Sequence, residues 1–505
     1  MDTETVTDQF DDLYVVSDLH LGGQDEFQVF EQGSLLKATI DKLYTHTEAG
    51  RRIGLVLNGD IVDFLAEANP KYLDTFGAVA KLKRIFQDPA FKPVWGALQR
   101  FIAKADNQLI LVLGNHDLEL ALPEVKLTLI NHLSKGKVAA KGRIHFSFDG
   151  TGYRCQINSR NILCMHGNEA DVWNLVDYSA LQEVRKSLVR GQAPPEWDAN
   201  AGTRLVLDVM NKIKRDYPIA DLLKPEREAI LPILAHLVKT KELASQLAQL
   251  SKIGMVKQRD GWRHWFGFLA AQDEIKVNAT LPSSEEVFSD LIGESTRNLN
   301  TEASRKLLIK AFRESENEQA ETLYLKEGGG GEYLGLEFWD RLLGKSDEQR
   351  AEELRIKLQK QLLGDKTFDI DGPDENFDEL DKLAGSDIDF LIAGHTHLYR
   401  AHQRKENHGY YYNTGTWATL IQLTTALLND KAAFFDVYKV FKSGDRSALK
   451  KCKIPTGNGK AASLLLHQPT LARIQYNSTG HVVSELCRAT ARGELVPITK
   501  SKYSF

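Results

Sequence analysis

Five groups of polar residues stand where short apolar runs end, and their side chains are of the kinds that bind metal ions. The groups are Asp18-Leu19-His20, Asp60, Asn115-His116-Asp117, His166 and His395-Thr396-His397. The apolar runs that precede them are 13–17, 53–57, 109–113, 162–165 and 390–393. Short continuous apolar runs are typical of strands buried on both faces. Because open α/β sheets place their sites beyond such strand ends, we expect the five groups to meet at one sheet edge.

The spacing within two of these groups predicts paired ligands. Alternate residues of a strand point to the same side of the sheet. On that basis Asp18 and His20 leave one strand end together, and His395 and His397 leave another. Strand alternation therefore predicts that the two side chains of each pair converge.

The number of suitable ligands exceeds what one tetrahedral ion requires. The seven side chains are Asp18, His20, Asp60, Asn115, His166, His395 and His397. A mixed set of oxygen and nitrogen donors suits Mn²⁺, Fe or Zn²⁺ better than Ca²⁺. The set predicts two divalent ions that share one carboxylate. Two ions about 3.5–4 Å apart can hold a phosphate, generate a hydroxide and stabilise the leaving oxygen.

Taken together, these groups resemble the sequence blocks of the calcineurin-like metallophosphoesterases. The matching blocks are 18–20 (DLH), 59–63 (GDIVD), 114–117 (GNHD), 166–167 (HG) and 394–397 (GHTH), in the order found in that family. Each block alone is weak, whereas five in order are highly specific. The resemblance covers residues 13–170 and 384–490. It implies a four-layer α/β/β/α sandwich that hydrolyses phosphoesters.

The resemblance also implies a role for each residue. Asp18, His20 and His397 would bind the first ion, Asn115, His166 and His395 the second, and Asp60 both. His116 would face the scissile phosphate and protonate the leaving group, while Asp117 or Asp63 would orient a neighbouring imidazole. The nucleophile would be a hydroxide activated by the two metals. The ions are expected to be Mn²⁺, with Fe, Zn²⁺, Ni²⁺ and Mg²⁺ as alternatives.

The elements that position these groups are predicted to form an α/β core interrupted by a helical insertion. Apolar runs alternate with helical patterns at 30–46 and 93–105, and strand patterns return near 390, with a β-hairpin at 471–486. Amphipathic patterns predict helices at 181–189, 203–215, 225–250, 301–324 and 346–363. We therefore expect core halves at 1–170 and 384–505 and a mainly α-helical cap domain at 171–383.

Several segments of the predicted insertion allow more than one interpretation. Asn168, Asp171, Trp173 and Asn174 follow His166 and could contact substrate, but we favour the alternative that Asn168 or Asp171 caps a helix. The basic and aromatic stretch 257–266 could bind phosphate and bases or, as we favour, be a loop anchored by buried tryptophans. The four glycines at 328–331 are expected to form a hinge, and the acidic stretch 364–379 a surface linker.

Composition narrows the class of protein. The chain has 505 residues, 42% of them hydrophobic, and a net charge of −5, which excludes global disorder and a uniformly basic nucleic-acid coat. Its four cysteines have no CxxC spacing and indicate neither a disulfide scaffold nor a thiolate zinc site. The acidic start lacks the features of a signal peptide, and no apolar run reaches about 18 residues. We therefore expect a soluble, cytoplasmic protein.

The leading hypothesis is a hydrolase acting on phosphodiester or pyrophosphate bonds of a nucleotide, nucleotide sugar or nucleic acid. Within the family, residues 413–417 (NTGTW) are similar to a segment of the UDP-2,3-diacylglucosamine pyrophosphatases. One alternative is a DNA nuclease of the SbcD type, although the sequence shows no large basic cluster. Another is a catalytically silent scaffold that retains the metal site. His116 speaks against the scaffold, because a structural site needs no proton donor.

Overall fold

The computed structural model describes residues 8–24, 27–45, 50–171, 173–225, 345–456 and 459–504, together with residues 233 and 237. The predicted helices at 225–250 and 301–324 fall almost wholly outside the described residues. So do the basic and aromatic stretch 257–266 and the glycine run 328–331.

Residue contacts divide the chain into two compact units, each built from separate parts of the sequence. The first unit comprises Met1–Thr203, Lys366–Thr419 and His467–Phe505, and the second comprises Arg204–Asp365 and Leu420–Leu466. This grouping differs from the predicted boundaries at 170 and 383, since residues 171–203 and 366–383 belong to the first unit. The first unit holds all the predicted metal ligands.

An eight-stranded sheet in the first unit joins strands from the two ends of the chain. Its strands are β2 (Asp12–Val16), β4 (Ile53–Asn58), β6 (Asn107–Val112), β7 (Ile144–Ser147), β18 (Thr470–Tyr476), β19 (Val482–Ala489), β20 (Leu495–Pro497) and β21 (Tyr503–Ser504). They run in the order β20-β19-β18-β2-β4-β6-β7, and β21 pairs with β19. β2, β4, β6 and β7 are parallel, whereas β18 is antiparallel to β2 and to β19. The predicted hairpin at 471–486 is therefore confirmed.

A six-stranded sheet forms the other half of the core. It consists of β1 (Asp8–Phe10), β8 (Tyr153–Ile157), β9 (Arg160–Cys164), β11 (Phe390–Ala393), β13 (Tyr410–Thr414) and β12 (Tyr399–Gln403), in that spatial order. β9, β11 and β13 are parallel, with Leu391 opposite both Leu163 and Tyr411. Residues on both sides of the predicted insertion thus pair directly within one sheet.

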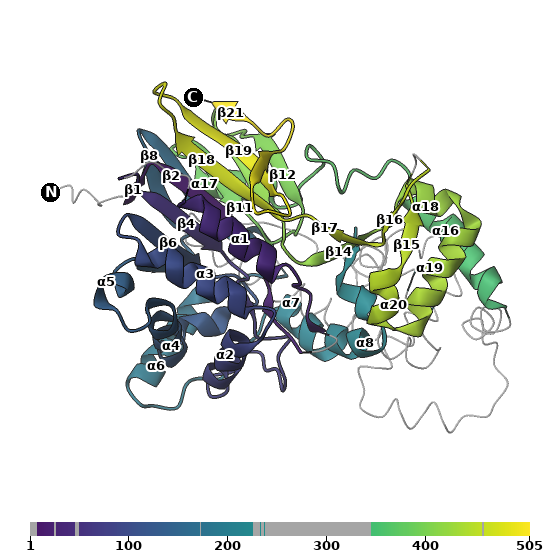
Figure 1. Ribbon diagram of the computed structural model, residues 1–505. Coiled ribbons are helices and arrows are strands. Elements are labelled where there is room, and N and C mark those ends of the chain that lie inside the picture. The colour runs from purple at the N-terminus through teal and green to yellow at the C-terminus, as the bar shows by residue number, and fades with distance from the viewer. Residues whose placement is uncertain are drawn as a thin grey trace, which may run out of the picture. The chain divides into compact units, whose positions relative to one another are not determined.

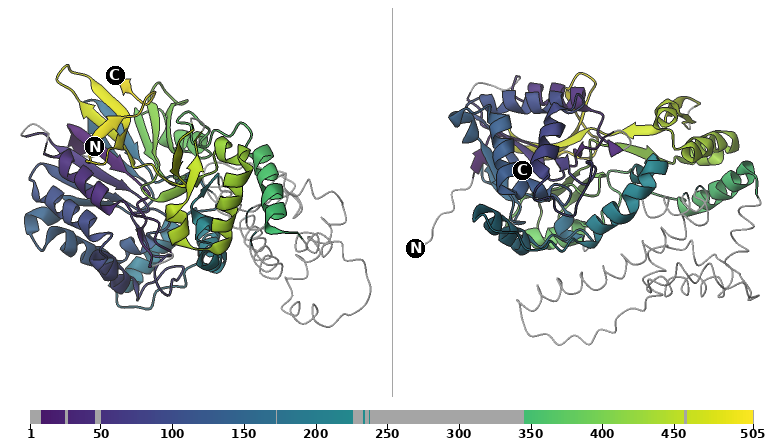
Figure 2. Two further views of the ribbon diagram at one scale, coloured as in Figure 1. Left: turned by 45° about the vertical axis from the view of Figure 1, so that its right-hand side comes forward. Right: turned by 90° about the horizontal axis from the view of Figure 1, so that it is seen from below.

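The two sheets pack face to face between layers of helices. Along β2, Leu13 and Val15 join an apolar cluster with Ile162 and Ile392 of the second sheet, while Tyr14 joins the cluster beneath the helices. Those helices are α1 (Gly33–Leu43), α2 (Ala78–Gln87), α3 (Lys92–Ala103), α4 (Pro123–Ser134) and α6 (Tyr178–Val189). Figure 1 shows α1 and α3 lying across this sheet, and Figure 2 shows the same layer from two other sides. Because side chains alternate along each strand, one strand supplies both cores.

The outer face of the six-stranded sheet is covered by α17 (Phe377–Ala384), which completes the predicted four-layer α/β/β/α sandwich. The prediction of a surface linker at 364–379 is wrong at its end, because Phe377 is buried there. Asp378 and Glu379 stand in the first turn of the helix, where carboxylates favour the helix start. The acidic residues at the end of the stretch 364–379 therefore belong to the start of a helix and not to a solvated loop.

The second unit is built from helices and short strands. Its described elements are α8 (Asn211–Asp216), α16 (Asp347–Gln361), α18 (Thr425–Asn429), α19 (Lys431–Ser443), α20 (Arg446–Lys451), β10 (Leu223–Lys224), β14 (Thr419–Gln422), β15 (Lys453–Pro455), β16 (Ala461–Ser463) and β17 (Leu465–His467). A capping box of Ser346 and Gln349 begins α16. The helices predicted at 181–189 and 346–363 are confirmed as α6 and α16. The helix predicted at 203–215 is also confirmed, and it consists of α7 (Ala201–Arg204), a π-helical stretch (Leu205–Met210) and α8. Of the helices that the structure describes, none is long and apolar enough to cross a membrane.

Candidate metal centre

The predicted site residues follow five strand ends of the first unit and meet in space. Asp18 and His20 follow β2, Asp60 follows β4, Asn115 and His116 follow β6, His166 follows β9, and His395 and His397 follow β11. Their ligand atoms form overlapping clusters, two of which contain only predicted ligands: Asp18, His20 and His397, and Asp60, His166 and His395. Within each cluster the ligand atoms lie within 4.8 Å of one another.

The first cluster brings two imidazoles against a buried carboxylate. The Nε2 atoms of His20 and His397 lie 3.0 Å apart, and His397 Nε2 lies 3.4 Å from Oδ1 of Asp18. Asp18 is fully buried. Three atoms that can each donate a lone pair thus converge on one point, as a cation site requires.

Asp60 connects the two clusters. Its Oδ2 atom lies 3.3 Å from Nε2 of His166 and 3.7 Å from Nε2 of His20. Its Oδ1 atom accepts a hydrogen bond of 2.9 Å from the backbone N–H of His116. A single buried carboxylate therefore faces imidazoles of both clusters, which is the position predicted for a shared ligand.

The donor atoms fit a bound cation. His166 is fully buried, and its Nδ1 lies 2.9 Å from the Asn58 carbonyl oxygen. That contact orients the ring so that Nε2 faces Asp60, where a cation can take the place of a proton. Buried Nε2 of His166 and Oδ1 of Asn115 make no hydrogen bond within the described part of the chain. Buried polar atoms are nearly always satisfied, so these two atoms, of which His166 Nε2 faces Asp60 at 3.3 Å, indicate a place for a metal ion.

Five of the seven predicted ligands have a left-handed backbone. They are Asp18, His20, Asp60, His395 and His397, with φ between 48° and 70°. This conformation costs residues other than glycine about 1–3 kcal/mol and is concentrated at functional sites. The prediction that strand alternation brings each pair of ligands together is therefore wrong. β2 ends at Val16 and β11 at Ala393, before the ligands, and His395 and His397 even belong to different clusters.

Mutual electrostatics set the pKa values of the buried groups. Burial raises the pKa of the Asp18 carboxyl, and the negative charge of Asp60 adds to this rise. Burial alone would lower the pKa of His166, but the adjacent Asp60 carboxylate raises it to about 10. The pKa of Asp60 lies well below its usual range, since His166 and His116 outweigh the effect of burial. Asp60 is therefore the anionic centre of the site.

His116 and Asp63 form a separate pair beside the two clusters. Asp63 ends β5 (Val62–Asp63), which pairs with β3 (Leu21–Gly22) directly after His20. Its carboxylate lies 3.4 Å from Nδ1 of both His20 and His116. The His116 side chain is 19% exposed, so the ring reaches solvent. Of the two carboxylates considered for orienting an imidazole, Asp63 is the one in contact with imidazoles.

Asp117 holds the backbone of the site loops. Its Oδ2 accepts a hydrogen bond of 2.7 Å from the N–H of Ile61, and its Oδ1 accepts one of 2.7 Å from the N–H of Gly114. Burial raises the pKa of this carboxyl to about 7. Asp117 therefore joins the loop that carries Asp60 to the loop that carries Asn115.

Two polar residues that follow His166 make contacts that sequence reasoning missed. Asp171 Oδ2 lies 2.9 Å from Nε2 of His395, and Oδ1 of Asn174 accepts a hydrogen bond of 3.3 Å from Nδ2 of Asn115. The sequence predicts that both contact substrate or that Asp171 caps a helix, whereas in the structure both touch predicted ligands. The only available signal was their position five and eight residues after His166.

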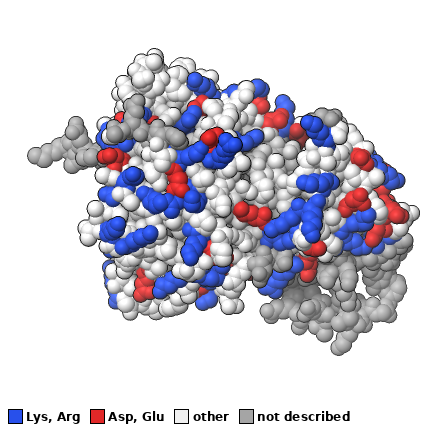
Figure 3. Space-filling view, in the orientation of Figure 1, with Lys and Arg blue, Asp and Glu red and all other residues white. Residues whose placement is uncertain are grey.

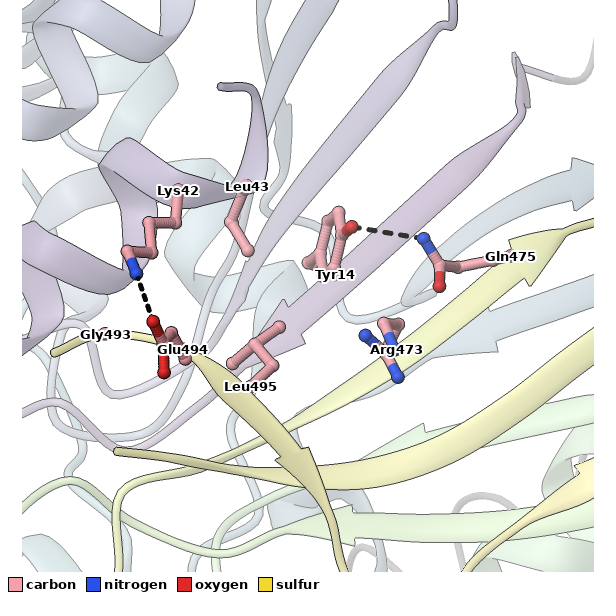
Figure 4. Close-up of a pocket in the computed structure, with 8 residues that line it drawn as sticks. All are labelled: Tyr14, Lys42, Leu43, Arg473, Gln475, Gly493, Glu494 and Leu495. Carbon is pink, nitrogen blue, oxygen red and sulfur yellow. Dashed lines mark hydrogen bonds and ion pairs between the residues drawn. The ribbon is translucent and has the colours of Figure 1, made fainter. Parts of the chain in front are cut away.

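A pocket of about 280 Å³ elsewhere in the first unit does not share this chemistry. It is lined by Tyr14, Lys42, Leu43, Arg473, Gln475, Gly493, Glu494 and Leu495 (Figure 4). Lys42 is paired with Glu494 at 3.0 Å, and Arg473 is paired with Glu485. Since both cations are neutralised within the chain, we assign this pocket no part in phosphate chemistry.

Comparison with known proteins agrees with the geometry. Residues 12–221 match the family model described as calcineurin-like phosphoesterase. This part of the chain is therefore similar to the calcineurin-like phosphoesterases, a family of hydrolases that bind divalent metal ions and act on phosphate esters. None of the curated proteins matches the chain. The family match ends well before β11, yet the structure places His395 and His397 beside the residues that it includes.

We predict that Gly114→Ala displaces Asp60 and weakens metal binding. A Cβ atom at Gly114 would lie 2.2 Å from Oδ1 and 2.3 Å from the backbone N of Asp60. Because misplacement by about 1 Å costs roughly 100-fold in rate, the variant should lose most of its activity and bound metal, measured by elemental analysis after dialysis. Gly96→Ala in α3 is the matched control, since its Cβ would meet only Arg100 Nη1 at 3.5 Å. Equal metal content in the two variants would contradict the prediction.

Proposed function

We propose that this protein hydrolyses phosphodiester or pyrophosphate bonds with the help of two divalent cations. The observation that carries the proposal is the position of Asp60, whose Oδ2 faces His166 Nε2 at 3.3 Å and His20 Nε2 at 3.7 Å. A carboxylate between two sets of imidazoles is suited to bridge two ions. We retain a cytoplasmic location as a prediction from the sequence.

We assign the ligands of each ion from the two clusters and add Asn115 from the resemblance to the family. Asp18, His20 and His397 hold the first ion, Asn115, His166 and His395 hold the second, and Asp60 is shared. This set of carboxylate, amide and imidazole donors favours Mn²⁺, with Fe, Zn²⁺, Ni²⁺ and Mg²⁺ as alternatives. Every one of these residues except His395 and His397 lies within the matched family region.

The chemistry divides between the ions and the protein. When bound, two divalent cations lower the pKa of water and neutralise the charge of a phosphate. His116 is placed to donate a proton to the leaving oxygen, since its ring is partly exposed and Asp63 fixes its Nδ1. Asp63 also fixes His20, whose Nδ1 lies 3.4 Å away. The leaving group and the first ion are thus positioned by the same carboxylate.

The segment that resembles the UDP-2,3-diacylglucosamine pyrophosphatases braces the site. Thr416 Oγ1 donates a hydrogen bond of 2.7 Å to the carbonyl oxygen of Asp18. Asn413 Nδ2 donates to the carbonyl oxygen of Gly394 at 2.7 Å. These contacts support the loops that carry the ligands, and they explain the segment without reference to substrate. We therefore keep nucleotide-sugar pyrophosphate as one candidate substrate among several.

A DNA substrate is the second candidate. Three exposed lysines, Lys450, Lys451 and Lys453, stand at the end of α20 and the start of β15. Figure 3 shows Lys and Arg side chains gathered over α20. Exposed cations of this kind attract a phosphate backbone in a salt-dependent manner. This surface is the observation that favours a nuclease.

The experiment that tests the proposal is a substrate panel on the Mn²⁺-loaded protein. The panel contains bis-p-nitrophenyl phosphate, nucleotides, cyclic dinucleotides, nucleotide sugars, and single- and double-stranded DNA. Turnover of any phosphodiester or pyrophosphate supports hydrolysis, and DNA binding that weakens steeply with salt would favour the nuclease. Two bound ions with no turnover on any phosphoester would instead indicate a silent scaffold.

Replacement of the shared ligand should remove both ions. We expect Asp60→Ala to lose metal and activity together, because both clusters lose the carboxylate that joins them. Elemental analysis after dialysis measures the ions, and hydrolysis of bis-p-nitrophenyl phosphate measures the activity. Asp41→Ala is the control, since Asp41 pairs with Lys37 and Arg100 on the outer helices. Two ions retained by Asp60→Ala would rule out the bridging role.

Replacement of the proposed proton donor should spare the metals. We expect His116→Ala to keep both ions and to lose kcat by roughly 10²–10⁴-fold, as for loss of a general acid. The loss should be larger for an alkyl leaving group than for p-nitrophenolate, which needs no proton. His481→Ala, in the turn between β18 and β19, is the control. An unchanged rate on the alkyl ester would exclude His116 as the acid.

A further inference from the structure

We propose that Asp171 and Asn174 form a clamp that positions two ligands of the second ion, His395 and Asn115. The inference rests on the proposed function and adds two positioning residues to it. Both residues lie in the first unit, in the segment between the 3₁₀ turn Asn168–Ala170 and α6. They contact the predicted ligands directly, so we assign them a positioning role that acts through the ligands.

Asp171 engages one nitrogen of the His395 ring. Its Oδ2 lies 2.9 Å from Nε2 of His395, across 224 residues of sequence. The same oxygen accepts a hydrogen bond of 2.7 Å from Nδ2 of Asn174, and Oδ1 accepts one of 2.9 Å from the N–H of Trp173. Because the Asp171 carboxylate accepts a hydrogen bond from Nε2–H of His395, Nδ1 is the ring nitrogen left to bind a cation. Such carboxylate–histidine contacts fix the ring and raise its basicity.

Asn174 orients the amide of Asn115. Its Oδ1 accepts a hydrogen bond of 3.3 Å from Nδ2 of Asn115. This contact turns the other end of the Asn115 amide, Oδ1, away from Asn174, and that oxygen is the buried atom with no hydrogen bond in the described chain. The amide nitrogen is therefore anchored, and the amide oxygen is available to a metal.

Gly202 packs closely against the clamp. The backbone N–H of Gly202 donates a hydrogen bond of 2.8 Å to the carbonyl oxygen of Trp173. A Cβ atom at Gly202 would lie only 1.9 Å from Oδ1 of Asn174. Any side chain at position 202 would therefore push Asn174 from Asn115.

A purely local turn does not account for these contacts. The hydrogen bond from the N–H of Trp173 to Oδ1 of Asp171 is one that a simple turn would make. The contacts of Asp171 with His395 and of Asn174 with Asn115 reach other loops, and the turn does not need them. Because Asp171 and Asn174 are also bonded to each other, the two ligands are coupled through one pair of side chains.

The clamp predicts a selective defect in the second ion. Asp171→Ala and Asn174→Ala should each weaken binding of one Mn²⁺ by about 10–100-fold and leave the other unchanged, as is usual for partners of metal ligands. Calorimetric titration with Mn²⁺ measures both affinities. Electron paramagnetic resonance should show the coupled ion pair replaced by a single ion at limiting Mn²⁺, and excess Mn²⁺ should restore it. The double variant should lose little more than either single one.

Asp177→Ala is the matched control, since Asp177 only caps α6 through the N–H of Ala180. It should bind both ions as the parent does. Parent-like affinities in both Asp171→Ala and Asn174→Ala, or equal weakening of both ions, would overturn the clamp and leave the two-ion proposal standing. A parent protein that binds fewer than two ions at saturating Mn²⁺ would overturn both. If Asp171→Ala fails to fold, Asn174→Ala decides the outcome.

Discussion

The buried carboxylate of Asp60 is the constraint on which the site depends. A carboxylate that leaves water must be compensated by opposite charge and hydrogen bonds. Asp60 is 1% exposed, and it finds the His116 N–H at 2.9 Å, His166 at 3.3 Å and His20 at 3.7 Å. These partners come from the ends of different strands. The two sheets must therefore pack in one register before Asp60 can be buried.

A ring of hydrogen bonds to backbone atoms holds these strand ends together. Asp117 accepts N–H groups from Ile61 and Gly114, and Thr416 donates to the carbonyl oxygen of Asp18. Such contacts fix the loops rather than the ligands, which explains how five ligands keep a left-handed backbone. The strain of those positions is opposed by the surrounding network, as is usual where geometry serves function.

The sequence predicted the strands, and the residues that meet at their ends, better than it predicted the reasons for their arrangement. Continuous apolar runs located β2, β4, β6, β9 and β11 to within two residues at each end, since strands buried on both faces must be apolar throughout. Strand alternation failed for His395 and His397 because the backbone turns left-handed after β11. That turn depends on contacts from distant loops, which local spacing does not encode.

Other features escaped sequence reasoning for the same physical cause. Phe377 stands in an acidic stretch that looks solvated, and its burial depends on Tyr411 of β13, which is distant in sequence. The contact of Asp171 with His395 spans 224 residues. A single polar residue in a loop carries no local sign of such a partner. Sequence patterns thus predicted residues that meet in space, whereas the residues that contact them from other loops required the tertiary structure.

The pairing of β2 with β18 has a consequence for the synthesis of this protein. Val15 lies opposite Ala472 in the antiparallel ladder, so the sheet is complete only after residue 472 has left the ribosome. Contacts so distant in sequence slow folding and prolong the exposure of unpaired strand edges. The nascent chain therefore carries Asp18 and His20 long before His395 and His397 exist, so the candidate metal centre can assemble only late in synthesis.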